Sequence, residues 1–220
     1  MSTHYARGMD GPARRERLAR SHLYLILEAR PRGQDPRPLL DAALPGGVDV
    51  VQLREKELGV EALLAAAETF RTACDEHGAL FLLNDRPELV VECCADGVHV
   101  GRSDMPVAQA RSLVGPDRLI GLSASTVAEL GAVDGADYVG VTAFVTPTKE
   151  DAVPGGLELL RAAAETLTVP WFAIGGIELS NLAEVAGAGA PGVAVVRAIR
   201  DASDPEAAAR ALRASLDRKE

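Results

Sequence analysis

The chain has 220 residues, a formal net charge of −9 at pH 7 and an apolar fraction of 47%. This length and composition suffice for one large domain or two small ones with a hydrophobic core. The acidic balance disfavours a nucleic-acid-binding surface, and no apolar run reaches the roughly 18 residues of a membrane-spanning helix. We therefore expect neither a nucleic-acid partner nor a membrane partner.

The cysteines and the N-terminus bear on the compartment. Cys74, Cys93 and Cys94 lack the spacing of a metal site or a disulfide framework, so we expect reduced thiols in or near the core. The first residues lack the apolar segment of a secretory signal. Both features favour a cytoplasmic protein.

Residues 1–20 are rich in Arg and Ala and contain Gly8, Gly11 and Pro12. We expect an N-terminal arm followed by a short helix over 13–19. The arginines there could form a recognition arm. Asp10 and Glu16 dilute their charge, however, which favours a solvated helix face.

From residue 21 onward, short apolar runs alternate with helical patterns. The predicted strands cover residues 22–28, 48–53, 79–83, 97–100, 119–122, 138–141, 170–174 and 193–196. The predicted helices cover residues 39–44, 60–76, 87–94, 106–114, 126–132, 156–165, 179–186 and 205–216. Ser180 is expected to cap the helix over 179–186.

This alternation predicts parallel strands joined by right-handed crossovers. Eight such units close into a (β/α)₈ barrel of the α/β class, which we assign to residues 21–220 as one catalytic domain. A doubly wound open sheet is the alternative, although it usually uses fewer strands and binds its ligand at one switch point. No linker or break in composition divides the chain.

In this barrel class the active site lies at the C-terminal ends of the strands. The prediction places two acids there, Asp85 and Asp104, after the third and fourth strands. Two carboxylates on one rim suit Mg²⁺, which also binds substrate phosphates. The other polar or glycine residues on this rim are Gln52, Arg54, Lys56, Asn84, Ser123, Thr146, Thr148, Lys149, Gly175, Gly176 and Arg197. Cations, hydroxyls and a glycine pair around two acids predict a polyphosphate site.

Most of these residues also have an ordinary structural explanation. Those that could be helix caps or loop residues are Asp85, Asp104, Asn84 and Ser123. Those that could be turn or surface residues are Thr146, Thr148 and Lys149. His99 lies within a predicted strand, which favours a hydrogen-bonded structural histidine over a catalytic base.

The segments VQLREK, LNDR, DGVHVGRSDMP, IGLSAS, TPTK, WFAIGGI and GVAVVRAI resemble, in this order, the motifs of thiamine-phosphate synthases, also called thiamine-phosphate pyrophosphorylases. Each motif alone is weakly specific, but the set is specific and runs over residues 23–199. The resemblance implies a (β/α)₈ barrel transferase that acts in thiamine biosynthesis. It would condense 4-amino-2-methyl-5-(diphosphooxymethyl)pyrimidine with a thiazole phosphate, giving thiamine phosphate and pyrophosphate. It also implies dependence on Mg²⁺ and a dissociative substitution.

The resemblance further implies a role for each matched residue. Asp85 and Asp104 match the metal ligands. The residues that match the pyrimidine-pyrophosphate site are Gln52, Arg54, Lys56, Asn84, Ser123 and Lys149. Those at the thiazole-phosphate site are Thr146, Thr148, Gly176, Val196 and Arg197. Of these, Lys149, Ser123 and Arg54 are expected to take part in catalysis.

Two features depart from the family's pattern. The segment GVTAFVTPTK is slightly shorter than usual and has Thr142 and Ala143 where a Gly-Pro pair is common. Arg197 lies where Ser is common. A relative that binds or isomerises the thiazole phosphate without synthase activity therefore remains the alternative, and a metal-free isomerase would not need the pair Asp85 and Asp104. A binding paralogue without activity and a phosphosugar barrel enzyme are further rivals. The sequence does not indicate an oligomeric state.

Overall fold

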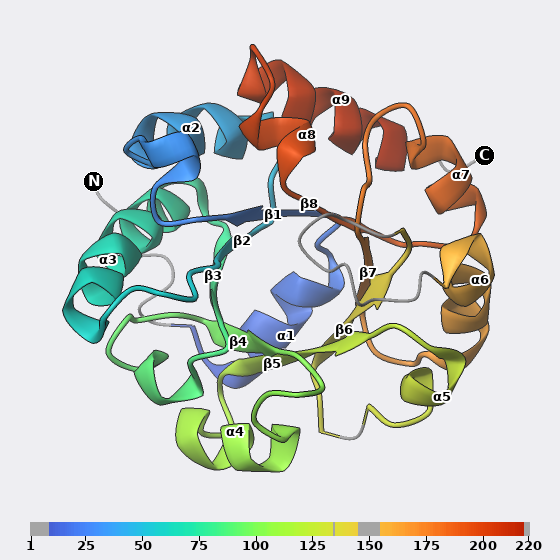
Figure 1. The fold of residues 1–220 in the computed structure, drawn as a ribbon, viewed down its shortest axis with the longest axis horizontal. Helices are drawn as coiled ribbons and strands as arrows, with labels where there is room; N and C mark the ends of the chain where they lie inside the picture. The colour runs from blue at the N-terminus through green and yellow to red at the C-terminus, as the bar shows by residue number, and fades with distance from the viewer. Residues whose placement is uncertain (1–8, 134, 145–154, 218–220) are drawn as a thin grey trace.

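The computed structural model describes residues 9–133, 135–144 and 155–217. Within these residues, eight strands form a closed parallel barrel in the order β1 to β8, which confirms the predicted (β/α)₈ fold (Figure 1). The strands are β1 (Leu23–Leu27), β2 (Val50–Leu53), β3 (Leu80–Asn84), β4 (Gly97–Val100), β5 (Leu119–Ala124), β6 (Tyr138–Thr142), β7 (Trp171–Ile174) and β8 (Val193–Val195). Pairing of β1 with β8 closes the ring.

Helices surround the barrel, and one further helix lies across its end. The α-helices are α1 (Gly11–Ala19), α2 (Arg37–Ala43), α3 (Val60–His77), α4 (Val107–Val114), α5 (Val127–Leu130), α6 (Gly156–Thr166), α7 (Leu182–Gly187), α8 (Arg197–Arg200) and α9 (Pro205–Asp217). Short 3₁₀ segments are η1 (Pro31–Gly33), η2 (Leu44–Gly46) and η3 (Pro87–Leu89). None of the helices in the described part of the chain has the length and apolar character needed to span a membrane.

The predicted helix over 87–94 is wrong. Only η3 forms there, and turns follow it. Cys94 has a φ of 52°, which a right-handed helix does not accommodate. The backbone N–H of Ala95 then reaches back to the carbonyl oxygen of Val90 at 3.0 Å and closes the turn before β4.

Two other local predictions also need correction. The helix predicted over 179–186 begins at Leu182, with Asn181 rather than Ser180 at its N-cap position. Helix α8, which has four residues, was not predicted.

Side chains that alternate along the strands divide the core into two clusters. One cluster lies between the strands and the outer helices. The other fills the barrel and contains Leu18, Tyr24, Ile26, Val50, Leu80, Leu82, Leu119, Tyr138, Phe172 and Ala194. Because Leu18 belongs to α1, this helix closes the N-terminal end of the barrel, and Figure 1 shows it across the ring of strands.

An aspartate immediately precedes each of β2, β4 and β6 at this closed end. These residues are Asp49, Asp96 and Asp137. Each carboxylate accepts hydrogen bonds from backbone N–H groups at or near the start of the preceding strand, at 2.7–3.0 Å. The donors are, in the same order, His22 and Leu23, then Phe81, then Ile120. The same device therefore ties β1 to β2, β3 to β4 and β5 to β6.

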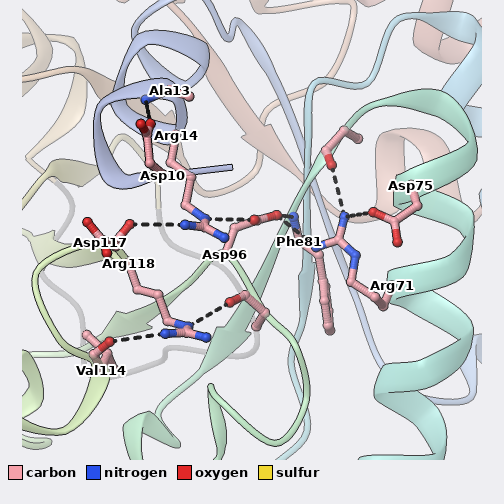
Figure 2. Close-up of polar contacts among 12 residues, drawn as sticks. Asp10, Ala13, Arg14, Arg71, Asp75, Phe81, Asp96, Val114, Asp117 and Arg118 are labelled. Carbon is pink, nitrogen blue, oxygen red and sulfur yellow. Dashed lines mark hydrogen bonds and ion pairs between the residues drawn. The ribbon is translucent and has the colours of Figure 1, made fainter. Parts of the chain in front are cut away.

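Arginines pair with all three acids, and Figure 2 shows the two arginines that meet the buried Asp96. Asp96 is paired with Arg14 of α1 at 3.0 Å and with Arg71 of α3 at 2.8 Å. Asp137 is paired with Arg15 of α1 at 2.7 Å. The prediction that the N-terminal arginines form a solvated face is therefore wrong for Arg14, which is 8% exposed, and Arg15 is paired as well. Both arginines hold α1 against the barrel.

Candidate active site

The C-terminal rim brings Asp85 and Asp104 together. Asp85 directly follows β3, and its backbone N–H donates to the carbonyl oxygen of His99 in β4 at 2.9 Å. Asp104 lies in the loop after β4, where its Oδ2 accepts from the backbone N–H of Gly101 at 2.8 Å. Neighbouring parallel strands thus deliver both carboxyls to the same edge, as the sequence predicted.

The electrostatics of Asp85 report this proximity. Burial raises the pKa of Asp85, and the negative charge of Asp104 and a hydrogen bond between the two carboxyls raise it further. The amide of Asn84, which donates to Oδ2 of Asp85, and the charge of Lys56 act in the opposite direction on this pKa. Two crowded carboxyls with oxygen atoms turned toward one another are a donor set that fits a hard divalent cation. Their role as metal ligands stays a prediction.

Asp85 also has an unusual backbone. Its φ of 56° lies in the left-handed region, which Asn and Asp tolerate better than most residues. This conformation turns the chain sharply at the end of β3. The hydrogen bonds to His99 and from Asn84 hold the turned residue beside β4.

The residues predicted after β2 differ in burial. Gln52 lies inside the barrel and is 2% exposed, with its Nε2 donating to the hydroxyl of Tyr24 at 2.6 Å. Arg54 is half-buried beyond the end of β2, and Lys56 is exposed. Lys56 is close enough to Asp85 for its charge to act on that carboxyl. The structure therefore places an amide within the barrel and cations at its mouth.

Ser123 lies within β5 rather than in the loop after it, because the strand extends to Ala124 and not only to the predicted residue 122. Its hydroxyl is 3.0 Å from Nε2 of His99, and Nδ1 of His99 is 3.1 Å from the hydroxyl of Tyr138. His99 is thus hydrogen-bonded at both ring nitrogens, as expected of a structural histidine. Sequence reasoning missed Tyr24 and Tyr138 as members of this network, because strand aromatics resemble ordinary core residues.

The glycine pair after β7 forms a tight turn. Gly175 has a φ of 103° and Gly176 a φ of 61°. A Cβ at Gly175 would lie 2.4 Å from the carbonyl oxygen of Phe144, so no other residue fits there without movement. Asn181, which the sequence did not single out for the site, donates from Nδ2 to the carbonyl oxygen of Gly176 at 3.0 Å.

The structure describes only some of the remaining predicted site residues. Val196 is half-buried at the N-cap of α8, and Arg197 is exposed in that helix. Thr146, Thr148 and Lys149 lie outside the described residues. Of the two departures from the family's pattern, Thr142 is a buried residue of β6, with its hydroxyl 3.1 Å from that of Ser125.

Arg102 is a further residue that the sequence did not identify. It lies in the same loop as Asp104, and its guanidinium donates to the carbonyl oxygens of Ser123, Glu129 and Ala132. These contacts fasten the loop that carries Asp104 to the end of β5 and to α5. The only signal in the sequence was that an arginine stands two residues before Asp104, a candidate metal ligand.

Residues 23–199 match the family described as thiamine monophosphate synthase (TMP-TENI). The chain belongs to this thiamine monophosphate synthase family. It is 47% identical to the thiamine-phosphate synthase of Thermobifida fusca (strain YX) over 208 residues, which cover 92% of this chain and 95% of that protein. Membership in the thiamine monophosphate synthase family thus confirms the resemblance drawn from the motifs.

Other relatives differ in length. The thiamine-phosphate synthase of Gloeobacter violaceus (strain ATCC 29082 / PCC 7421) is 47% identical over 194 residues, covering 87% of this chain but 56% of that protein. Across this and two further relatives, the chain spans 56–62% of their length. Among solved structures, a thiamine phosphate pyrophosphorylase from Pyrococcus furiosus superposes with a TM-score of 0.82 and 34% identity, covering 92% of this chain and 97% of that one. This neighbour belongs to the same family by its name.

Proposed function

We propose that the protein is a Mg²⁺-dependent thiamine-phosphate synthase. It would condense the diphosphooxymethyl pyrimidine with a thiazole phosphate and release pyrophosphate. The observation that carries the proposal is the pair Asp85 and Asp104, brought together on the C-terminal rim of a barrel of this family. Cytoplasmic location and small-molecule substrates are part of the same proposal.

The proposed site divides its tasks among three kinds of group. Asp85 and Asp104 would hold the cation, which supplies positive charge to a bound diphosphate. Arg54 and Lys56 at the end of β2 would neutralise the remaining phosphate charge. Gln52 and Asn84, both buried, would orient the pyrimidine through amide hydrogen bonds.

The proposed chemistry needs no nucleophilic side chain. The bond between the pyrimidine's methylene carbon and the diphosphate oxygen breaks first, and pyrophosphate leaves with the electron pair. The lone pair of the thiazole nitrogen then forms the new carbon–nitrogen bond with the pyrimidinylmethyl cation. Fixed positive charge stabilises the leaving diphosphate, and the barrel holds the two rings in line.

A turnover assay with both substrates, with and without Mg²⁺, tests the proposal. We expect thiamine phosphate and pyrophosphate in equal amounts only when Mg²⁺ is present. Asp85→Asn should abolish turnover while the fold survives, because Asn also tolerates a positive φ. Glu158→Gln removes one carboxylate from an 85% exposed side chain in α6 and serves as the matched control.

Two results would contradict the proposal. One is the absence of product with both substrates and Mg²⁺, while calorimetry still detects binding of the thiazole phosphate; this would favour the binding paralogue without synthase activity. The other is equal turnover by the wild type and Asp85→Asn, which would remove the acid pair from the reaction. The isomerising alternative predicts a product from the thiazole phosphate alone.

A further inference from the structure

A continuous chain of hydrogen bonds crosses the interior of the barrel from β2 to β5. Its members are, in order, Gln52, Tyr24, Tyr138, His99 and Ser123. The four distances along it are 2.6, 3.0, 3.1 and 3.0 Å. The two ends are residues that we place in the substrate site, while the three middle members connect them.

The two tyrosines of the chain are sealed from water. Tyr24 is 2% exposed and Tyr138 is fully buried. Burial raises the pKa of both hydroxyls well above that of free tyrosine, so both remain protonated. The hydrogen of a buried hydroxyl needs an acceptor, and each of these hydroxyls has two hydrogen-bond partners among the described residues. Where one partner donates, the other partner must therefore accept.

Gln52 sets the direction of these hydrogen bonds, because its Nε2 can only donate. Tyr24 accepts from Gln52 and therefore donates to Tyr138. Tyr138 in turn donates to Nδ1 of His99. The reverse order would require the carbonyl oxygen of Gln52 to lie where its amide nitrogen lies.

We infer that Tyr24, Tyr138 and His99 are positioning residues that transmit the orientation of the Gln52 amide to Ser123. With Nδ1 accepting, His99 carries its proton on Nε2 and donates it to the hydroxyl oxygen of Ser123. The hydrogen of Ser123 then points to an acceptor other than His99. In terms of the proposed function, on which this last step rests, Ser123 presents a donor to an anionic or ring-nitrogen acceptor of the substrate.

The barrel is shaped to hold the chain in place. A Cβ at Gly121 would lie 2.1 Å from the ring of Tyr138, and a Cβ at Gly140 would lie 3.1 Å from the ring of His99. Phe172 packs edge-on against both tyrosines, with ring centroids 5.3 and 5.9 Å away. The rings can hardly rotate out of line, which preserves the hydrogen-bond directions.

The tautomer of His99 is the direct test, and it requires no substrate. The ¹⁵N shifts of both ring nitrogens can be read from a two-bond ¹H–¹⁵N spectrum of histidine-labelled full-length protein, with His99→Gln assigning the signals. We expect the wild type to show the Nε2–H tautomer alone. Tyr24→Phe cuts the chain but keeps Tyr138 beside Nδ1 and Ser123 beside Nε2 of His99, so a share of the Nδ1–H tautomer should appear. Ile26→Val removes volume from the same strand and the same cluster and should leave the spectrum unchanged.

The outcomes separate this inference from the proposed function. A wild-type spectrum with the Nδ1–H tautomer or a mixture, or an unchanged spectrum in Tyr24→Phe, would overturn the inferred chain even if the protein is a synthase. If the synthase assay succeeds, Tyr24→Phe should raise KM for the pyrimidine diphosphate about fivefold, the effect of one weakened hydrogen bond. An unchanged KM with an altered tautomer would overturn the substrate-facing step alone.

Discussion

The ring of Tyr138 lies directly over Gly121. A Cβ at Gly121 would come 2.1 Å from Cζ of that ring, which is fully buried and flanked by Tyr24 and Phe172. The lack of a side chain at Gly121 therefore leaves the space that the ring of Tyr138 occupies. The two residues are paired in the register of β5 and β6.

Gly121→Ala should consequently destabilise the protein. Overpacking of a filled core costs about 1–3 kcal/mol, and the rigid ring has no open side toward which to move. Denaturant unfolding measures the loss. Gly187→Ala is the control, because no atom lies within 4 Å of a Cβ there and Ala favours the helix. Equal stability of Gly121→Ala and the wild type would show that the ring is not confined.

Asp96→Asn should be among the most destabilising changes of a single residue. It leaves Arg14 and Arg71 without their shared carboxylate in a site that is 1% exposed at Asp96. Removal of one partner from a buried ion pair costs about 3–5 kcal/mol. Glu16→Gln, which breaks an exposed pair with Arg20 on α1, should cost less than about 1 kcal/mol. Similar unfolding free energies for the two variants would contradict this account.

Arg102→Ala should loosen the loop that carries Asp104. Three carbonyl oxygens lose their donor, which we expect to cost about 1–2 kcal/mol of stability. Amide hydrogen exchange should accelerate at Gly101 and Asp104, and half-maximal activity should require more Mg²⁺. Arg161→Ala, which removes an exposed pair in α6, is the control. Unchanged exchange in the loop would rule out the fastening role of Arg102.

Asp85→Asn should separate cation binding from folding. Without divalent cations the variant should be at least as stable as the wild type, since it removes repulsion from Asp104 and keeps the positive φ tolerable. Added Mg²⁺ should raise the melting temperature of the wild type alone. A free Mg²⁺ concentration of about 100 times Kd should add about 2.7 kcal/mol to its free energy of unfolding. Differential scanning fluorimetry measures the melting temperatures of both proteins with and without Mg²⁺. A melting temperature that rises equally in the two proteins would place the cation elsewhere.

The cysteines should differ sharply in reactivity. Burial raises the pKa of Cys74 to about 12 and that of Cys93 to about 11, whereas Cys94 is exposed. Because the thiolate is the reactive form, a disulfide reagent at pH 8 should modify Cys94 alone in the folded protein. Rapid labelling of all three thiols under native conditions would be inconsistent with this structure.

The same two thiols should make stability depend on pH. Their pKa values in the folded protein lie above those in the unfolded chain, so their contribution is complete below about pH 8.5 and is lost as pH rises toward 11. Unfolding free energies between pH 8 and 10.5 should therefore fall less steeply in a Cys74→Ala, Cys93→Ala double variant. An identical pH dependence would show that the thiols do not contribute.

Much of the rim could be predicted from the sequence. Short apolar runs reveal the strands, and the residues that follow parallel strands lie at one edge of the barrel. Asp85 and Asp104 were identified in this way, as was Asn84. Ser123 was placed in a loop because periodicity does not reveal that β5 runs on to Ala124. The left-handed conformation of Cys94, which ends the predicted helix over 87–94, leaves no mark in hydrophobic patterning.

The long-range ion pairs and hydrogen bonds that stabilise the fold could not be predicted from the sequence. The pairing of Arg14 with Asp96 joins residues 82 positions apart, and only the closed barrel brings them together. The hydrogen bonds of Arg102 depend likewise on where α5 ends. Local patterns predict elements, but they do not identify which distant carboxylate or carbonyl a given arginine meets.

The aspartates before β2, β4 and β6 divide much of the barrel into two-stranded modules. Each of Asp49, Asp96 and Asp137 binds backbone at or near the start of the strand before its own. A chain break within a module therefore puts the two partners of that hydrogen bond near opposite ends of the permuted chain, whereas a break between modules leaves all three pairs close in sequence. New termini placed between β2 and β3 or between β4 and β5 should thus give circular permutants that refold more readily than those opened between β3 and β4.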